Sequence, residues 1–259
     1  WFARGARKYF LDGAFSSHSA WLTDAYVDAP ETCGSGLPAE KIARFVSRAN
    51  RGGRQLACHS IGDAATAAYL DAVESTEGRS AHRAKELRHR VEHGQLIRPA
   101  DFERLERLGM VVSAQPHAAA DPEKDAALLG PERAKRAYPF RSLVDAGVPL
   151  AFGSDYPGEH TFAPLLGIHL AVNRDGGQAI TAEEALECYT AGGAWAEFRE
   201  NDKGRIKPGY LADLAILSAD PTAVDRTRIR DISVVATVVD GRFVHLRAGT
   251  DIGSASTTA

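Results

Sequence analysis

The sequence predicts an α/β protein in which helices cover a parallel sheet. Two observations lead to this prediction: short apolar segments alternate with amphipathic stretches, and polar turn residues separate them. This alternation is typical of βα units, in which a helix follows each strand and packs on the sheet. Five such units occupy about 200 residues, which fits either a small open sheet or the second half of an eight-unit barrel.

The expected strands are short runs rich in apolar side chains. They cover residues 8–11, 54–58, 86–92, 110–114 and 148–153. The expected helices begin at residues that favour the first turn of a helix, such as Pro, or at residues that cap it. These starting residues are Pro38, Asp63 as an N-cap, Pro99, Glu132 for a single helix to Ala146, and Thr181, which forms a capping box with Glu184.

The character of the chain changes after about residue 198. Residues 211–217 and 234–239 are expected to form strands, and Asp240-Gly241 predicts a hairpin turn into a third strand. Residues 201–250 are therefore expected to form a small β unit without helices. Residues 251–259 are polar and are expected to be a disordered tail.

The amino-acid composition indicates which binding partners and which cellular compartment to expect. The chain has 31 basic and 34 acidic residues, a net charge of −3, so we expect neither nucleic acid nor a membrane as a partner. No run of about 18 apolar residues is present, so no transmembrane span is expected. Three scattered cysteines indicate a reducing compartment and predict a cytoplasmic protein. Because residue 1 is Trp, we expect the chain to be part of a longer protein. A targeting signal upstream of residue 1 is compatible with this expectation.

Three polar residues lie where predicted strands end. His59 follows the second strand, His93 follows the third, and Asp155 follows the fifth. The carboxyl ends of parallel strands form the rim that carries active sites. Imidazole and carboxylate ligands suit Zn²⁺ or a similar divalent ion. Each residue alone also has an ordinary explanation, as a satisfied loop histidine or a turn-capping carboxylate, but one metal site would explain all three together.

At these residues a family resemblance appears. The chain resembles the amidohydrolase superfamily, specifically the amidohydrolase-3 group of YtcJ-like metal-dependent hydrolases. The matching segments cover nearly the whole chain in order, and they are residues 8–13, 59–65, 88–95, 115–117, 153–157 and 204–214. The resemblance implies the C-terminal part of a (β/α)₈ barrel, with strands four to eight in residues 1–200. Residues 201–250 would then be the C-terminal part of a composite β-sandwich.

The resemblance also implies roles for the polar residues. His59 and His93 would be metal ligands, and Asp155 would both contact the metal and handle a proton. Lys8 would occupy the place where such enzymes carry a carboxylated lysine that bridges two metals. The family's His-x-His pair on the first barrel strand is absent, so the remaining ligands for one or two ions, expected to be zinc, would lie upstream. A one-metal site without modified lysine is the alternative.

The function that follows is hydrolysis of an amide-type, non-peptide carbon–nitrogen bond. A metal-activated water would attack the substrate, and Asp155 would act as the proton shuttle. The alternatives are a deaminase of the same superfamily, or a non-catalytic fragment because the His-x-His pair is missing. We expect a small-molecule substrate contacted by His117, Tyr156 and Arg90, although strict strand alternation would separate Arg90 from His93. Open sheet edges predict a homo-oligomer.

Overall fold

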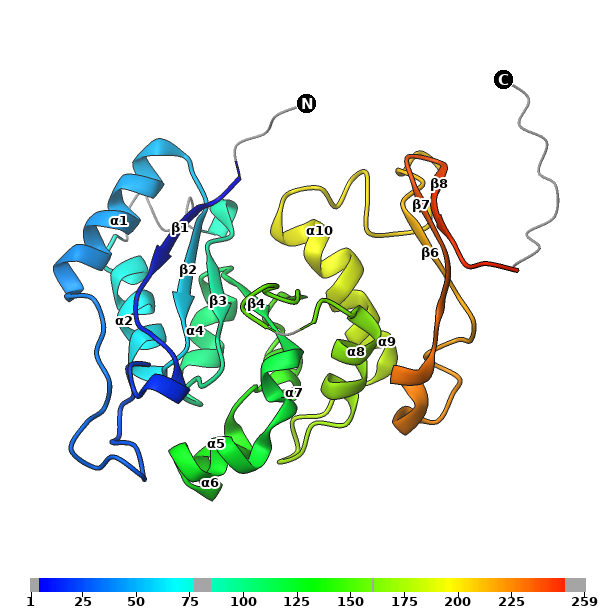
Figure 1. The fold of residues 1–259 in the computed structure, drawn as a ribbon. Helices are drawn as coiled ribbons and strands as arrows, with labels where there is room; N and C mark the ends of the chain where they lie inside the picture. The colour runs from blue at the N-terminus through cyan, green and yellow to red at the C-terminus, as the bar shows by residue number, and fades with distance from the viewer. Residues whose placement is uncertain (1–4, 77–84, 160, 250–259) are drawn as a thin grey trace.

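The computed structural model describes residues 5–76, 85–159 and 161–249. It contains a parallel sheet of five strands and an antiparallel sheet of three strands. Figure 1 shows the parallel strands as a curved layer with helices on its outer side, and the antiparallel sheet beyond α8, α9 and α10. The prediction of a mixed α/β chain with a parallel sheet is confirmed.

The parallel sheet runs in the order β1-β2-β3-β4-β5, which is also the order of the strands in the sequence. A doubly wound sheet reverses its strand order at a switch point, whereas a (β/α)₈ barrel adds its strands sequentially. The observed order therefore fits an arc of such a barrel. The strands are β1 (Arg7–Phe10), β2 (Leu56–Ser60), β3 (Arg90–His93), β4 (Val111–Ala114) and β5 (Leu150–Phe152).

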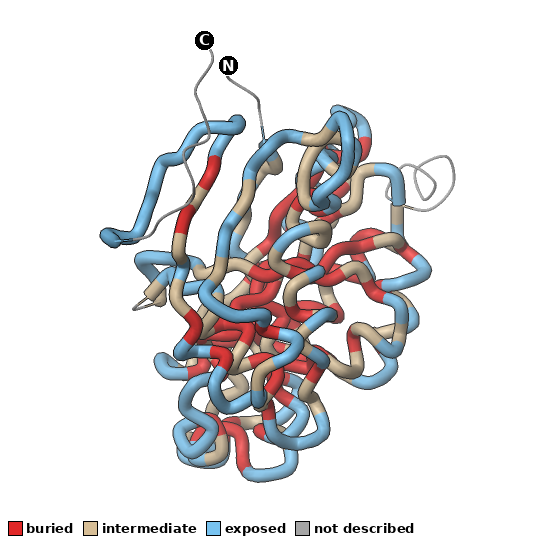
Figure 2. Tube along the Cα trace, turned by 90° about the vertical axis from the view of Figure 1, so that its right-hand side faces the viewer, coloured by how far each residue is buried: buried red, intermediate tan, exposed pale blue. Residues whose placement is uncertain are grey.

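Side chains alternate between the two faces of this sheet. Leu56 and Cys58 of β2 point into the main hydrophobic core under the helices. His59 follows Cys58 directly and therefore lies on the opposite face. The register pairs His59 with Glu92 of β3, so these two side chains share the inner face of the arc. Buried residues concentrate in the middle of the molecule (Figure 2).

Nine helices of the described residues surround the arc. They are α1 (Ala39–Gly52), α2 (Asp63–Glu74), α4 (Asp101–Arg107), α5 (Pro122–Leu129), α6 (Pro131–Arg136), α7 (Phe140–Asp145), α8 (Pro164–Val172), α9 (Ala182–Glu187) and α10 (Gly193–Ala196). The predicted capping box is confirmed, because Thr181 Oγ1 accepts from the Glu184 N–H and the Glu184 carboxylate accepts from the Thr181 N–H. A π-helical turn, Cys188–Gly192, joins α9 to α10.

Several predicted boundaries are wrong for local reasons. The Arg54 N–H bonds to the Ala49 carbonyl and so belongs to the end of α1, which delays β2 to Leu56. Asp63 is the first residue of α2 and Gly62 its N-cap.

Two longer predicted segments are also wrong. Residues 85–87 are helical, so β3 begins only at Arg90. The single helix expected over residues 132–146 is two helices, because Tyr138 has a left-handed backbone (φ 52°) and Pro139 follows it.

The antiparallel sheet consists of β6 (Leu214–Leu217), β7 (Val234–Val239) and β8 (Arg242–Leu246). Asp240 and Gly241 both have positive φ, as the predicted two-residue hairpin turn requires. The predicted tail, residues 251–259, lies outside the described residues. Within the described part of the chain, no helix has the length and apolar character needed to cross a membrane.

Candidate active site

Two imidazoles meet at the carboxyl ends of β2 and β3. The ring centroids of His59 and His93 are 4.3 Å apart, and the ring planes are inclined by 65°. Strict alternation would turn His93 toward the helices, as it does Val91. The backbone of His93 is left-handed (φ 76°), which ends the alternation and allows its ring to lie against that of His59. The sequence predicted that His59 follows its strand, but His59 lies within β2.

Hydrogen bonds assign a tautomer to each ring. His59 Nε2 lies 3.0 Å from the Gly13 carbonyl oxygen, which can only accept, so Nε2–H is the donor. His93 Nδ1 lies 2.7 Å from Gln115 Oε1 and is the donor for the same reason. The lone pairs therefore lie on His59 Nδ1 and His93 Nε2. Metal-binding histidines typically donate their other N–H in this way.

Both rings are held in the neutral form. Burial lowers the pKa of His93 to about 4, and the charges of His59 and Lys8 act in the same direction, while Asp155 opposes them. Burial also lowers the pKa of His59. Since a metal binds only the neutral imidazole, both rings are ready for this role at pH 7.

A buried carboxylate that sequence reasoning missed supports His59. Asp12 accepts hydrogen bonds from the N–H groups of Trp21, Ile61 and Gly62, at 3.0, 3.0 and 2.7 Å. Its Oδ1 lies 3.7 Å from His59 Nε2. Burial raises the pKa of Asp12 to about 6. The available signal was an acidic residue directly after an expected strand, within the matching segment 8–13.

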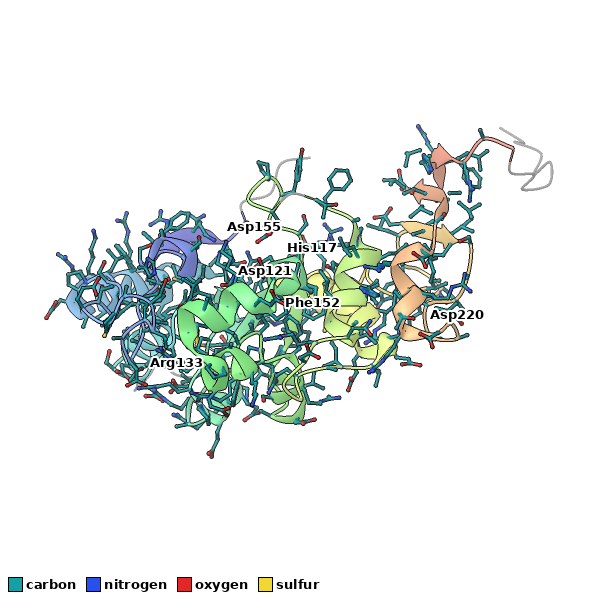
Figure 3. All side chains as sticks on the ribbon, turned by 60° about the horizontal axis from the view of Figure 1, so that its bottom comes forward. His117, Asp121, Arg133, Phe152, Asp155 and Asp220 are labelled. Carbon is teal, nitrogen blue, oxygen red and sulfur yellow. The ribbon has the colours of Figure 1, made fainter. Side chains whose placement is uncertain are left out.

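A cavity of about 500 Å³ brings most of the predicted site together. His59, His93, His117 and Asp155 all line it. A view from the lower end of the molecule in Figure 1 shows Asp155, His117 and Asp121 near one another in the centre, with Asp220 far to one side (Figure 3). The volume lies within the range typical of small-molecule sites.

Asp155 sits in a tight turn at the rim of this cavity. Its backbone is left-handed (φ 55°), and its carbonyl accepts from the Gly158 N–H at 2.6 Å. A Cβ on Gly158 would lie 3.0 Å from Asp155 Oδ2, so glycine permits this close approach. The carboxylate is near enough to raise the pKa of both His59 and His93. Its charge therefore favours a cation between these groups.

His117 is buried and offers an unused acceptor. Its Nε2–H donates to the Ala163 carbonyl at 3.0 Å, so Nδ1 carries the lone pair. No described residue bonds to Nδ1. His117 lines the cavity, but Nδ1 itself is shielded from solvent, so a bound molecule would reach it only after a local movement of the ring.

Three predicted site residues do not line this cavity. Lys8 is exposed on β1, with Nζ 5.1 Å from the centre of the Phe10 ring. Arg90 forms a 2.7 Å ion pair with Glu92 on the inner face of the arc, because side chains two residues apart on a strand point to the same face.

The third of these residues is Tyr156. It is 58% exposed, and its ring packs edge to face against Phe162 at 5.3 Å. None of the three residues therefore lines the cavity, although the charge of Lys8 acts on both histidines.

The chemistry of the two imidazoles fits a divalent metal, but they supply only two donors. Among residues 5–76, 85–159 and 161–249, no group of three or more His, Cys, Asp or Glu side chains is arranged to hold a metal ion. His59 and His93 therefore form part of a ligand set.

The chain has the fold of barrel-type metal-dependent hydrolases. Its parallel strands follow one another in sequence, and two imidazoles meet at their carboxyl ends. In the solved structures, it is similar to an uncharacterized metal-dependent hydrolase from Pyrococcus furiosus (TM-score 0.70, 34% identity, 78% of this chain and 42% of that one). The model of the amidohydrolase family matches residues 1–245. The chain belongs to the amidohydrolase family, as the sequence motifs had suggested.

Curated relatives give the same assignment. The chain is 34% identical over 255 residues to the putative amidohydrolase YtcJ of Bacillus subtilis, covering 93% of this chain and 47% of that protein. It is 29% identical over 256 residues to the N-substituted formamide deformylase of Arthrobacter pascens, covering 95% of this chain and 46% of that protein. The chain thus spans about half the length of the curated relatives it matches.

Proposed function

We propose that this chain carries part of the active site of a metal-dependent hydrolase that cleaves an amide-type, non-peptide carbon–nitrogen bond. The observation that carries the proposal is the pair of neutral imidazoles of His59 and His93, which line one cavity with Asp155. Membership of the amidohydrolase family supports the reaction class. A relative named as an N-substituted formamide deformylase supports a small amide as the substrate class.

The metal would be held by His59 Nδ1 and His93 Nε2, with Asp155 as a carboxylate ligand. We propose zinc, because imidazole and carboxylate are its usual ligands at catalytic sites. When bound, such a cation supplies Lewis acidity toward a carbonyl and lowers the pKa of water. The further ligands would come from other parts of the protein.

Lys8 enters this proposal as a carboxylated side chain. Its positive charge lowers the pKa of both His59 and His93, so the free ammonium opposes a cation at the same place. Carboxylation would replace that positive charge with a negative one. Lys8 would then favour metal binding, after a change of rotamer away from the Phe10 ring.

The polar residues of the cavity have separate tasks. The Asp155 carboxylate would accept a proton from the attacking water and return it to the nitrogen of the departing amine. His117 Nδ1 would accept a hydrogen bond from the substrate and fix its orientation. Tyr156 would contact a substrate only at the mouth of the cavity, because it lies on the same loop as Asp155 and is exposed.

The setting of this enzyme is also part of the proposal. All three cysteines are free thiols, which supports a reducing, cytoplasmic compartment. A second copy of the chain would cover exposed apolar residues such as Phe10 and Phe243, so we propose a homo-oligomer.

Metal analysis tests the central claim. Protein purified without chelator should contain near-stoichiometric divalent metal, and His59→Ala or His93→Ala should lower the metal content at least tenfold. The matched control is His245→Ala, since His245 is exposed on β8 and should leave the content unchanged. Wild-type protein without metal, or equal content in all variants, would contradict the proposal.

A second experiment isolates the proton role. Asp155→Asn should abolish hydrolysis of an N-alkylformamide while much of the metal stays bound. Full residual activity in this variant would refute that role.

A further inference from the structure

The lining of the cavity contains two acidic residues one helical turn apart. Asp121 caps α5, where its Oδ1 accepts from the Lys124 N–H at 3.0 Å. Asp125 follows four residues later, and both residues line the cavity. The capping bond explains the presence of Asp121, but nothing local explains an acid at position 125.

Asp125 lies on the buried side of α5, together with Leu128 and Leu129. It is only 6% exposed. One carboxylate oxygen accepts a long hydrogen bond from Tyr138 Oη, at 3.4 Å. The other oxygen, Oδ2, is buried and has no partner among the described residues. A buried carboxylate oxygen without a partner is destabilising, and a native protein that retains one has a reason for it, such as a bound water, ion or ligand.

Burial is the main effect that disfavours the ionised form of Asp125. Burial raises the pKa of Asp125 to about 6, and Asp121 adds to this effect, while Arg174 and Lys124 oppose it. Arg174, which is buried, directs Nη2 to the carbonyls of Ala134 and Ala137. It stabilises Asp125 only at a distance.

The cavity as a whole carries excess negative charge. Among the described residues that line it, three aspartates, Asp121, Asp125 and Asp155, stand against one ammonium group, that of Lys124. A divalent cation at the imidazoles would offset only part of this excess. Apolar side chains such as Phe15 and Leu128 also line the cavity, which suits the methylene chain of a small molecule.

We propose that Asp121 and Asp125 bind a protonated amino group of the substrate, at the end remote from the bond that is cleaved. The substrates of this site are then amides that carry a second, positively charged amine. An ammonium group placed here would form a charge-assisted hydrogen bond with Asp125, after a rotation of the side chain that brings the buried Oδ2 to the cavity. This inference rests on the proposed function, which identifies the amide as the reacting group. It adds that the other end of the substrate carries a positive charge.

The test compares two ligands of the same shape, N-(4-aminobutyl)acetamide and N-pentylacetamide, which differ by an ammonium in place of a methyl group. Isothermal titration calorimetry at pH 7.5 should give at least tenfold tighter binding of the amine. Asp125→Asn should remove most of this preference, and Asp121→Asn should reduce it. Glu123→Gln is the matched control, because Glu123 is exposed on the same helix and does not line the cavity.

Equal affinity of the wild type for both ligands, or no binding of either at millimolar concentration, would overturn the inference. A preference that survives in both Asp121→Asn and Asp125→Asn would also overturn it. If Asp125→Asn loses its native circular dichroism spectrum, the Asp121→Asn result decides alone. Because binding is measured without turnover, a protein that prefers the amine yet hydrolyses no amide would refute only the proposed function.

Discussion

The guanidinium carbon of Arg88 lies 3.4 Å from the centre of the Trp195 ring. Arg88 Nη1 also donates to the Trp195 carbonyl at 2.8 Å, and Nη2 forms a 2.6 Å ion pair with Glu200. Arg88 precedes β3, whereas Trp195 belongs to α10 more than 100 residues later. One side chain therefore connects the first strands of the arc to the segment that leads to the antiparallel sheet.

Removal of this connection should destabilise the protein. Arg88→Gln loses the cation–π contact and leaves Glu200 partly buried without its cation, so we expect a loss of about 2 kcal/mol in the free energy of unfolding. Urea denaturation measures it. Lys135→Gln, which breaks an exposed ion pair with Glu132, should leave the midpoint unchanged. Equal midpoints for both variants would show that the contact is not stabilising.

Asp12 should be required for the geometry of His59. Asp12→Asn keeps the shape of the side chain but replaces one acceptor oxygen with a donor, so at least one backbone N–H loses its partner. We expect a loss of about 1–3 kcal/mol together with weaker metal binding, measured by denaturation and by metal titration. Asp28→Asn is the control, because Asp28 makes only an exposed pair with His18. Unchanged metal affinity in Asp12→Asn would limit Asp12 to a structural role.

Gly167 should tolerate no side chain. A Cβ at this position of α8 would lie 1.9 Å from Tyr189 Oη and 3.0 Å from His117 Cε1. Gly167→Ala should therefore displace His117, destabilise the protein by about 1–3 kcal/mol, and weaken the binding of amide ligands. Gly193→Ala is matched to it, since a Cβ there meets no atom within 4 Å. Similar stability and ligand affinity in the two variants would contradict this packing argument.

His89 should make stability fall in mild acid. It is fully buried, its Nδ1 accepts from the Leu56 N–H, and its Nε2–H donates to Asn50 Oδ1. Burial lowers its pKa from 6.5 to about 4. Between these values the unfolded chain binds more protons than the folded one, so its contribution to stability is present above pH 6.5 and is lost as the pH falls toward 4.

The comparison of wild type with His89→Gln isolates this effect. Asp12 and Asp125, with pKa values raised to about 6, act in the opposite direction and are present in both proteins. The stability difference between wild type and variant should shrink by about 2 kcal/mol from pH 7.5 to pH 4.5. A difference that is constant across this range would show that His89 is not held neutral.

Features with a local chemical cause were predictable from the sequence. The capping box of Thr181 and Glu184 and the turn at Asp240-Gly241 depend only on neighbouring residues, and both predictions are confirmed. The strand boundaries were less predictable. The start of β2, for example, is delayed because Arg54 is hydrogen-bonded to the end of α1. The break between α6 and α7 depends on the backbone of Tyr138, which tertiary contacts help to fix.

The candidate site shows the same division. The positions of His59, His93 and Asp155 after strand-like segments were sufficient to expect them at one rim, and all three line one cavity. The importance of Asp125 could not be read from the sequence, because its isolation depends on a distant Tyr138 and on two leucines of its own helix. The exposure of Lys8 likewise could not be read from the sequence, because Lys8 shares a face with Phe10, whose ring lies 5.0 Å from that of His59, on a strand at the edge of the sheet.

The placement of the imidazole pair on adjacent paired strands has a consequence for diversification. Hydrogen-bonded strands lie about 4.8 Å apart whatever their loops contain, and the two rings are 4.3 Å apart. Their separation therefore depends on the backbone alone: the ladder sets the strand spacing, and the left-handed backbone of His93 turns its ring toward His59. Asp121, Asp125 and Tyr156 lie outside the ladder, so natural divergence or a randomised library can change them and retune ligand preference without dismantling the imidazole pair.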